Sequence, residues 1–285
     1  MTTSTFQQRG ACSAAIPWDA AAAGWNEQAP LIRPWLGEAT AAMLDMADIQ
    51  PDMRVLDIAA GAGDQSCDIA RRVGPGGAVL ATDISPKMLA AAAANLRAAN
   101  LDNVRTLVAD GEALGLEDAN FDAATCRLGL MFLGDPLRGL QSIRHALRPG
   151  GRFCALVFSE PSTNPCIGLT VSIAMRHAGL PVVDPYRPGS LFSLGKPGLF
   201  EALFKTAGFV DVEMRRVDAA FRLTSGEDYL RFIKTAAGPV MAILDALDEA
   251  ARQAAWAEIA EALSPFTSAA GWEAPTELLL AAGAR

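Results

Sequence analysis

Five glycine and carboxylate positions could form a binding site for a polar small molecule. Asp57 precedes a glycine turn containing Gly61 and Gly63, in the run VLDIAAGAGD. Asp83 ends the run AVLATD twenty residues after Gly63, and Asp110 ends the run VRTLVAD. Glycines let the backbone approach a ligand closely, and a carboxylate placed like Asp83 can accept both hydroxyl groups of a ribose. With Asp110 able to accept an exocyclic amine of adenine, the spacing indicates an adenosine site.

The composition around this site argues against a dinucleotide. The fingerprint G-x-G-x-x-G of dinucleotide folds is incomplete, because Ser66 stands where its third glycine would be. No cluster of lysine or arginine accompanies the carboxylates, although paired phosphates would need positive charge. The site therefore favours a nucleoside with positive charge over one with a pyrophosphate.

Short β-branched runs alternate with helical segments before residue 160, which is typical of βαβ units. Strands are predicted at 53–58, 78–83, 104–109, 121–126 and 152–158, with two more at 209–217 and 276–282. The dipeptide Ser85-Pro86 marks a helix start, with serine as N-cap and proline at the first helical position. We expect an α/β fold with a mostly parallel, Rossmann-like sheet of seven strands, helices on both of its faces and a helical cap.

The chain divides by character into four parts. Residues 1–50 are predicted to be a helical lid, 51–160 the cofactor-binding core and 161–208 a cap insertion. Residues 209–285 would supply the last strands, with cap helices inserted at 225–264. After residue 160 we expect helices at 169–177, 196–207, 227–237 and 239–263. Trp18 and Trp25 share one helix face and are equally suited to a core anchor and to a lid over the ligand.

Charge and cysteine content narrow the class of protein. The chain has 285 residues and a net charge of −8, which argues against nucleic acid and anionic membranes as partners. It contains no apolar run long enough to span a bilayer and no secretory signal at the N-terminus, so a cytoplasmic location is expected. The five cysteines lie far apart without a C-x-x-C motif, so neither a disulfide framework nor a metal site is predicted.

The motifs VLDIAAGAGDQ, ATDISPKML, ADGEAL, FDAATCRLGLMFLGDP and HALRPGGRF, in this order, resemble class I S-adenosylmethionine-dependent methyltransferases. Among these, the chain is most similar to the small-molecule branch that includes the ubiquinone and menaquinone biosynthesis methyltransferases. The resemblance implies S-adenosylmethionine as cofactor and S-adenosylhomocysteine as product. The cofactor contacts that it implies are Asp57, Ala59, Gly61, Gly63, Gln65, Asp83, Ile84, Met88, Asp110, Gly111, Glu112 and Arg127. The acceptor contacts that it implies are Trp25, Leu128, Met131 and Phe132. Ala59 departs from the family, which commonly has glycine at this position.

The expected function is methyl transfer to a small, largely apolar organic acceptor by in-line displacement. Positioning and exclusion of water can drive this reaction, because the leaving group is already activated. His177 in the cap is the histidine to test as a general base. Two alternatives stay open: an NAD(P)-dependent oxidoreductase and a protein that binds the cofactor without transferring its methyl group. The acceptor, the methylated atom and the oligomeric state, including a homodimer, also stay open.

Overall fold

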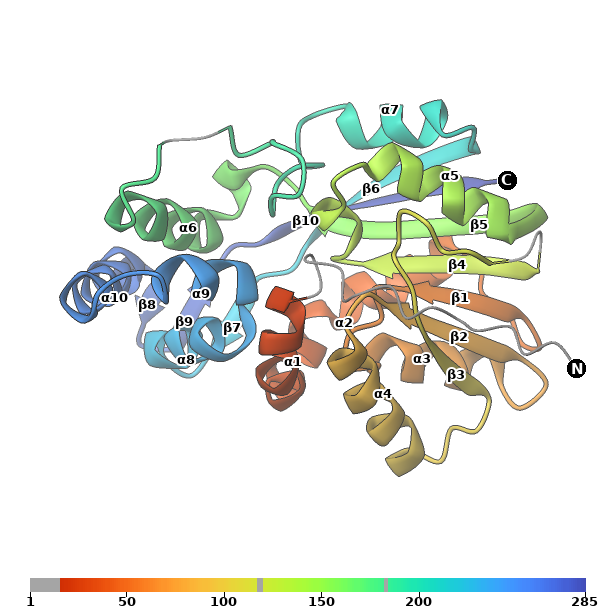
Figure 1. The fold of residues 1–285 in the computed structure, drawn as a ribbon, viewed down its shortest axis with the longest axis horizontal. Coiled ribbons are helices and arrows are strands. Elements are labelled where there is room, and N and C mark those ends of the chain that lie inside the picture. The colour runs from red at the N-terminus through yellow and green to blue at the C-terminus, as the bar shows by residue number, and fades with distance from the viewer. Residues whose placement is uncertain (1–15, 117–119, 182–183) are drawn as a thin grey trace, which may run out of the picture.

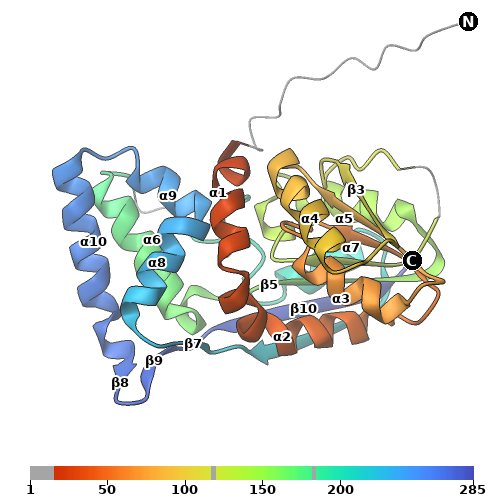
Figure 2. The same cartoon turned by 90° about the horizontal axis from the view of Figure 1, so that it is seen from below.

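A computed structural model describes residues 16–116, 120–181 and 184–285 of the chain. One part is a central sheet flanked by helices, the other is a mostly helical cap, and helix α1 lies between them (Figures 1 and 2). The ends of the sheet strands, the cap and α1 together surround the site described below.

The central sheet has seven strands in the order β3-β2-β1-β4-β5-β10-β6. The strands are β1 Arg54–Ile58, β2 Ala78–Asp83, β3 Val104–Val108, β4 Phe121–Arg127, β5 Leu147–Phe158, β6 Val210–Asp218 and β10 Glu277–Ala284. All pairings are parallel except those of β10, which runs antiparallel to both β5 and β6. The prediction of a mostly parallel seven-stranded sheet is confirmed, with strand ends within two residues except at the start of β5.

Two groups of helices cover this sheet. The first group is α2 Ala29–Met46, α3 Asp64–Val73 and α4 Pro86–Ala98, and the second is α5 Pro136–Ala146 and α7 Leu199–Thr206. The chain leaves β1 toward β3 and then returns to β4 on the other side of β1. Because parallel crossovers are right-handed, this reversal puts α3 and α5 on opposite faces and opens a crevice between β1 and β4. Ligands of such sheets bind in that crevice.

Helix α4 begins as the sequence predicts. The Ser85 hydroxyl accepts a hydrogen bond from the Met88 backbone N–H at 3.1 Å, and Pro86 is the first helical residue. This N-cap fixes where β2 ends and where Met88 begins to pack.

The cap is built from helices α6 Pro165–His177, α8 Gly226–Ala236, α9 Gly238–Leu244 and α10 Glu249–Leu263. A small sheet of β7 Phe221–Leu223, β9 Gly271–Ala274 and β8 Thr267–Ser268 closes it. The described residues also form the 3-10 turns η2 Leu130–Phe132, η3 Pro161–Thr163 and η4 Ser264–Phe266.

The expected single helix over 239–263 is wrong. Asp248 interrupts it, because its carboxylate accepts the Ala251 backbone N–H at 2.8 Å and so caps α10 as a new helix. An acidic side chain at an N-cap competes with continuation of the preceding helix. The small three-stranded sheet is a further element that the sequence patterns do not indicate.

Helix α1, Ile16–Glu27, is attached to both parts of the molecule. Toward the core, Asp19 accepts a hydrogen bond from the Ser85 hydroxyl, and the Asn26 side chain accepts one from the Asn95 amide at 2.6 Å. Toward the cap, Gly24 lies against the backbone carbonyl of Thr235 in α8, so closely that a Cβ atom would stand 1.7 Å from that oxygen. Only glycine permits this approach of the two helices.

In residues 16–116, 120–181 and 184–285, no helix combines the length and the apolar character needed to cross a bilayer. In the same ranges, no group of three or more potential ligand side chains could hold a metal ion. Cys67, Cys126, Cys154 and Cys166 are buried free thiols, and Cys12 lies outside the described residues.

Candidate cofactor and acceptor site

One cavity of about 570 Å³ opens at the carboxyl ends of the parallel strands and continues under the cap. This volume falls in the usual range for small-molecule sites. Its walls come from α1, the β1, β2 and β4 ends, the segments 109–112 and 128–134, and the cap helices α6, α8 and α9. The cavity therefore spans the core, the cap and the helix between them.

Most of the site residues expected from sequence line this cavity. The cofactor residues that do so are Ala59, Gly61, Gln65, Asp83, Ile84, Met88, Asp110, Gly111, Glu112 and Arg127. The acceptor residues Trp25, Leu128, Met131 and Phe132 line it as well. Asp57 and Gly63 lie behind the cavity wall, and His177 lies elsewhere.

The part of the cavity lined by the expected cofactor residues is called the cofactor half below. In it, Asp83 connects the end of β2, the glycine turn and the start of α4. One carboxylate oxygen accepts the Gly61 backbone N–H at 2.9 Å and the other accepts the Ser85 backbone N–H at 2.9 Å. A carboxylate has about four acceptor positions, more than its backbone donors occupy. Burial is the largest influence on this carboxyl group and raises its pKa, while the backbone donors oppose that change. The side chain thus holds the glycine turn against the start of α4 and still can accept from a ligand.

Asp110 and Glu112 organise the next strand end. The Asp110 carboxylate accepts the Glu112 backbone N–H at 2.9 Å. The Glu112 carboxylate accepts the backbone N–H groups of Gly134 and Asp135 at 2.7 and 3.1 Å. Glu112 therefore joins two loops of the cavity rim, and Asp110 and Asp83 both face the same cavity, as the sequence predicts.

The glycine turn contains a strained alanine. Ala59 has φ of +54°, in the left-handed region that favours glycine. Its methyl group fits because residue 129 is glycine: a Cβ atom there would stand 2.3 Å from the Ala59 Cβ. Gly129 itself has φ of −108°, which any residue can adopt. Ala59 and Gly129 are thus a size-matched pair at the crevice.

We expect Gly129→Ala to destabilise the protein by about 2 kcal/mol through overpacking against Ala59. Adding Ala59→Gly should recover most of this loss, since the second change removes the clashing methyl group and suits the left-handed backbone. Urea denaturation of the wild type, both single variants and the double variant measures the coupling, expected at about 1–2 kcal/mol. Additive effects would contradict the contact.

The Asp57 side chain is buried behind the glycine turn and does not line the cavity. Its carboxylate accepts hydrogen bonds from the Gln65 amide, the Ser66 hydroxyl at 2.5 Å and the Thr125 hydroxyl at 3.2 Å. Desolvation by burial raises its pKa from 3.8 to about 6, against the lowering effect of these donors. Asp57 therefore links β1 to α3 and β4 beneath the cofactor half.

The raised pKa of Asp57 predicts a pH dependence of stability. Between its unfolded pKa of 3.8 and its folded pKa of about 6, the folded state retains a proton that the unfolded state releases. The free energy of unfolding therefore falls as pH rises through this window, by roughly 2–3 kcal/mol, and the contribution is constant above it. Denaturation of wild type and Asp57→Asn from pH 4 to pH 7 isolates the contribution of Asp57. The contributions of the other titratable groups are the same in both proteins and cancel in the difference between their free energies of unfolding. A difference that does not vary with pH would contradict this pKa.

Arg127 is a nearly buried cation beside the cofactor half. Its guanidinium pairs with Asp64 at 3.1 Å and donates to the Thr40 hydroxyl at 2.9 Å, with 7% of the side chain exposed. It is the sole lysine or arginine among the described residues that line the cavity. Because Arg127 is already engaged with Asp64 and Thr40, the described cavity lining offers no cluster of positive charge for paired phosphates.

Gln65 presents an unused acceptor. Its amide nitrogen donates to Asp57, while its oxygen Oε1 is buried without a hydrogen-bond partner among the described residues. Gln65 lines the cavity next to the glycine turn. This side chain therefore holds Asp57 beneath the turn, and its oxygen is buried away from the cavity space.

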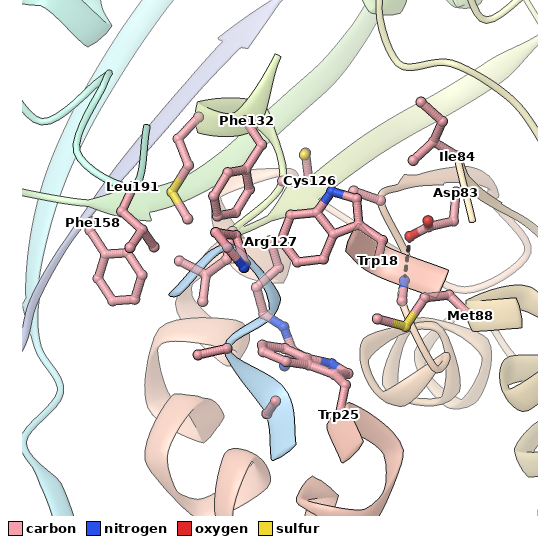
Figure 3. A pocket seen from close by; sticks show the side chains of 18 of the residues that line it. Trp18, Trp25, Asp83, Ile84, Met88, Cys126, Arg127, Phe132, Phe158 and Leu191 are labelled. Atoms are coloured by element: carbon pink, nitrogen blue, oxygen red, sulfur yellow. Dashed lines mark hydrogen bonds between the residues drawn. The ribbon is translucent and has the colours of Figure 1, made fainter. Parts of the chain in front are cut away.

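The rings of α1 cover the cofactor half (Figure 3). Trp18 lies edge-on to Phe132 with ring centroids 4.8 Å apart, and both tryptophans of α1 pack against the cluster of Ala21, Ala22 and Met88. The Trp25 indole nitrogen would be 3.5 Å from a Cβ atom on Gly61. Trp25, expected on the acceptor side, thus stands over the glycine turn, and Trp18 is a lining residue that motif spacing did not assign.

The remainder of the cavity is apolar and comes mainly from the second half of the chain. Its lining residues there are Trp35, Phe158, Ile167, Thr170, Leu191, Phe221, Tyr229, Phe232, Ile233, Ala236, Ala237, Pro239 and Val240. The sequence analysis expects a cap from the segments 161–208 and 225–264, but it assigns none of these residues to the acceptor. The usable signal was the helical spacing of Tyr229, Phe232, Ile233 and Ala236, which marks a buried face of α8.

His177 is not positioned as a base. Its ring nitrogen Nε2 lies 2.9 Å from a Glu258 carboxylate oxygen, and Arg176 pairs with the same glutamate. His177 is absent from the residues that line the cavity. The last turn of α6 faces α10 and not the ligand chamber, so this histidine joins two cap helices.

The order of the strands and the position of the cavity belong to a fold that solved methyltransferases share. A putative methyltransferase from Bacillus halodurans shares the fold, with a TM-score of 0.59, 18% identity, and coverage of 87% of this chain and 99% of that chain. Phosphoethanolamine N-methyltransferase 2 from Haemonchus contortus, solved with S-adenosyl-L-methionine, has a TM-score of 0.57 and 17% identity, covering 97% of this chain and 60% of that one.

Sequence comparison identifies the core more closely. Residues 38–176 match the model of the ubiE/COQ5 methyltransferase family, so this part of the chain is similar to that family. The curated ubiquinone/menaquinone biosynthesis C-methyltransferase UbiE of Idiomarina loihiensis is 40% identical over 119 residues, which is 41% of this chain and 47% of that protein. The chain thus spans about half the length of the curated relatives it matches, and α8, α9 and α10 lie outside the family match.

Proposed function

We propose that this protein transfers a methyl group from S-adenosylmethionine to a small, largely apolar organic acceptor. The observation that carries the proposal is the continuous cavity that joins carboxylate-bearing strand ends to an apolar chamber under the cap. The match of the core to C-methyltransferases of quinone biosynthesis supports methyl transfer. The acceptor is not taken over from those relatives, because the chamber is largely built by residues beyond the matched range.

The residues of the cofactor half fit this cofactor. Asp83 would accept hydrogen bonds from the ribose hydroxyl groups, and Asp110 with the Gly111 backbone would bind the adenine edge. A net acidic surface suits a sulfonium cation and repels a pyrophosphate, which counts against an NAD(P)-dependent oxidoreductase.

S-adenosylmethionine supplies a methyl group on a positively charged sulfur, which an acceptor atom can displace in line. The chain contributes orientation and a chamber that excludes water, with α1 as lid and α6, α8, α9 and α10 as cap. No histidine or lysine is present among the described cavity-lining residues. The residues there thus favour acceptors that are already nucleophilic near neutral pH.

The proposal is tested in two stages. Titration calorimetry should detect binding of S-adenosylmethionine and S-adenosylhomocysteine but not of NAD. A panel of phenols, quinol precursors and amines, with release of S-adenosylhomocysteine as readout, should then reveal methyl transfer. NAD binding without binding of either sulfur ligand would disprove the proposal. Cofactor binding without turnover on any acceptor would favour a protein that holds the cofactor without using it.

We further propose that the protein acts in the cytoplasm on a free small molecule and not on nucleic acid. The net charge of −8 supports the exclusion of nucleic acid, because a negatively charged protein repels polyanions. Size-exclusion chromatography with light scattering distinguishes a monomer from a homodimer.

A further inference from the structure

Strand β6 forms an open edge of the central sheet. Among the described residues it pairs with β10 alone, and Figure 1 shows it at the end of the sheet opposite to β3. Its residues are exposed except Val212 and Val217, which are half-buried. An edge strand carries unpaired N–H and C=O groups that can pair with a strand of another chain, and charged side chains often prevent such pairing. The charges on β6 therefore decide whether this edge repels or accepts a second strand.

The charges on β6 have both signs and are only partly used within the chain. The Glu213 carboxylate pairs with Arg152 at 3.1 Å, yet 62% of the Glu213 side chain is exposed. The Arg215 side chain is exposed and has no partner among the described residues. Because side chains alternate between the two faces of a strand, Glu213 and Arg215 share one face. Between them stands Met214, which is 38% exposed on the other face.

Two-fold symmetry restricts how β6 could pair with its own copy. In an antiparallel pair, hydrogen-bonded and non-hydrogen-bonded residue pairs alternate, so a two-fold axis must pass through a residue that opposes itself. Axes at residues 212, 213, 215 and 216 each bring like charges directly opposite each other, which is destabilising. An axis at Met214 instead places Glu213 opposite Arg215 of the copy, and does so twice. An axis nearer to an end of β6 leaves only a few residues paired.

The other edge of the sheet, β3, is not complementary to itself. Leu107 and Val108 are 40% and 53% exposed there, but Arg105 is the one charged residue of the strand. No register of β3 with its own copy therefore brings opposite charges together. Pairing of β3 with β6 of another copy would leave a free edge at each end, so it would continue as an open chain and not close.

We propose that β6 pairs antiparallel with β6 of a second copy of this chain, on a two-fold axis at Met214. Main-chain hydrogen bonds join the two central sheets at their edges, and the two Glu213–Arg215 pairs select the register. None of the described residues that line the cavity belongs to β6, so both cavities keep their walls in the dimer. Because one strand from each copy makes the contact, the dimer should be weak and should dissociate on dilution.

The test is a charge reversal divided between two variants. Sedimentation velocity from low micromolar to submillimolar protein should show wild type in a concentration-dependent equilibrium of monomer and dimer. Glu213→Arg puts two arginines on each strand, and Arg215→Glu puts two glutamates there, so each variant alone should dimerise about tenfold more weakly. An equal mixture of the two variants should recover the dimer, because each arginine then opposes a glutamate of the other variant.

Two further measurements assign the dimer to this edge. Amide hydrogen exchange in the segment 210–218 should slow as the wild-type concentration rises, because pairing protects the outward N–H groups. Arg105→Glu reverses a charge on β3 and is the matched control, which should dimerise like wild type. The exposed Glu213–Arg152 ion pair contributes little to stability, so Glu213→Arg and Arg215→Glu should keep the thermal midpoint of the wild-type monomer.

Wild type that stays monomeric at submillimolar concentration would overturn the inference. A dimer that persists in both charge-reversed variants would overturn it as well, because the contact would then lie elsewhere on the surface. A mixture that does not recover the dimer would show that the two charges do not face each other across the axis. Loss of the dimer in Arg105→Glu would assign the contact to β3.

Discussion

Replacement of Asp83 by alanine is expected to weaken S-adenosylhomocysteine binding by about 100-fold, close to 3 kcal/mol. This exceeds the loss of one ligand contact, because the same carboxylate accepts the Gly61 and Ser85 backbone N–H groups. The alanine variant leaves both donors without their partner and loosens the glycine turn and the start of α4. Titration calorimetry measures the change in affinity, and thermal denaturation follows the accompanying loss of stability.

Two further variants separate the roles of this carboxylate. Asp83→Asn keeps one acceptor oxygen but has no charge, so it should recover part of the stability and less of the affinity. Asp102→Ala removes an exposed carboxylate outside the cavity lining and should leave both quantities unchanged. Wild-type affinity in Asp83→Ala would place the cofactor elsewhere in the molecule.

The second large effect is expected from Gly24→Ala, which should separate α1 from the cap. A Cβ atom at this position would lie 1.7 Å from the Thr235 carbonyl oxygen and 2.4 Å from the carbonyl carbon. Backbone atoms cannot yield as a flexible side chain does, so the helices must move apart. We expect a loss of about 3 kcal/mol in stability and weaker cofactor binding, because Trp18 and Trp25 move with α1. Urea denaturation measures the loss of stability, calorimetry measures the affinity for the cofactor, and tryptophan emission reports the displacement of α1.

Gly37→Ala is the matched control for this prediction. Gly37 lies in α2, and a Cβ atom added there would have no neighbouring atom within 4 Å, so the same substitution meets open space. It should stabilise the protein by roughly 0.5–1 kcal/mol, since alanine favours helix over glycine. If both variants were stabilised alike, the close contact between α1 and α8 would not exist in solution.

The amino-acid sequence determined the elements that depend on neighbouring residues. The β-branched runs became the central strands, and Ser85-Pro86 became the start of α4, because propensity and capping act within a few residues. The strand-end carboxylates Asp83 and Asp110 came together for a general reason, since parallel strands present their carboxyl ends at one edge. Their shared cavity was therefore predictable.

Only the tertiary structure decided how the second half of the chain meets that edge. Tyr229 and Gly61 line one cavity although 168 residues separate them, and no local pattern encodes that approach. His177 pairs with Glu258 because α6 docks on α10, and Asp57 lies behind the turn because Gln65, Ser66 and Thr125 enclose it. Helical periodicity marks the face that is buried but not the partner that buries it. The partner is selected by the fit of side chains across elements that are remote in sequence, and the acceptor chamber is the product of that fit.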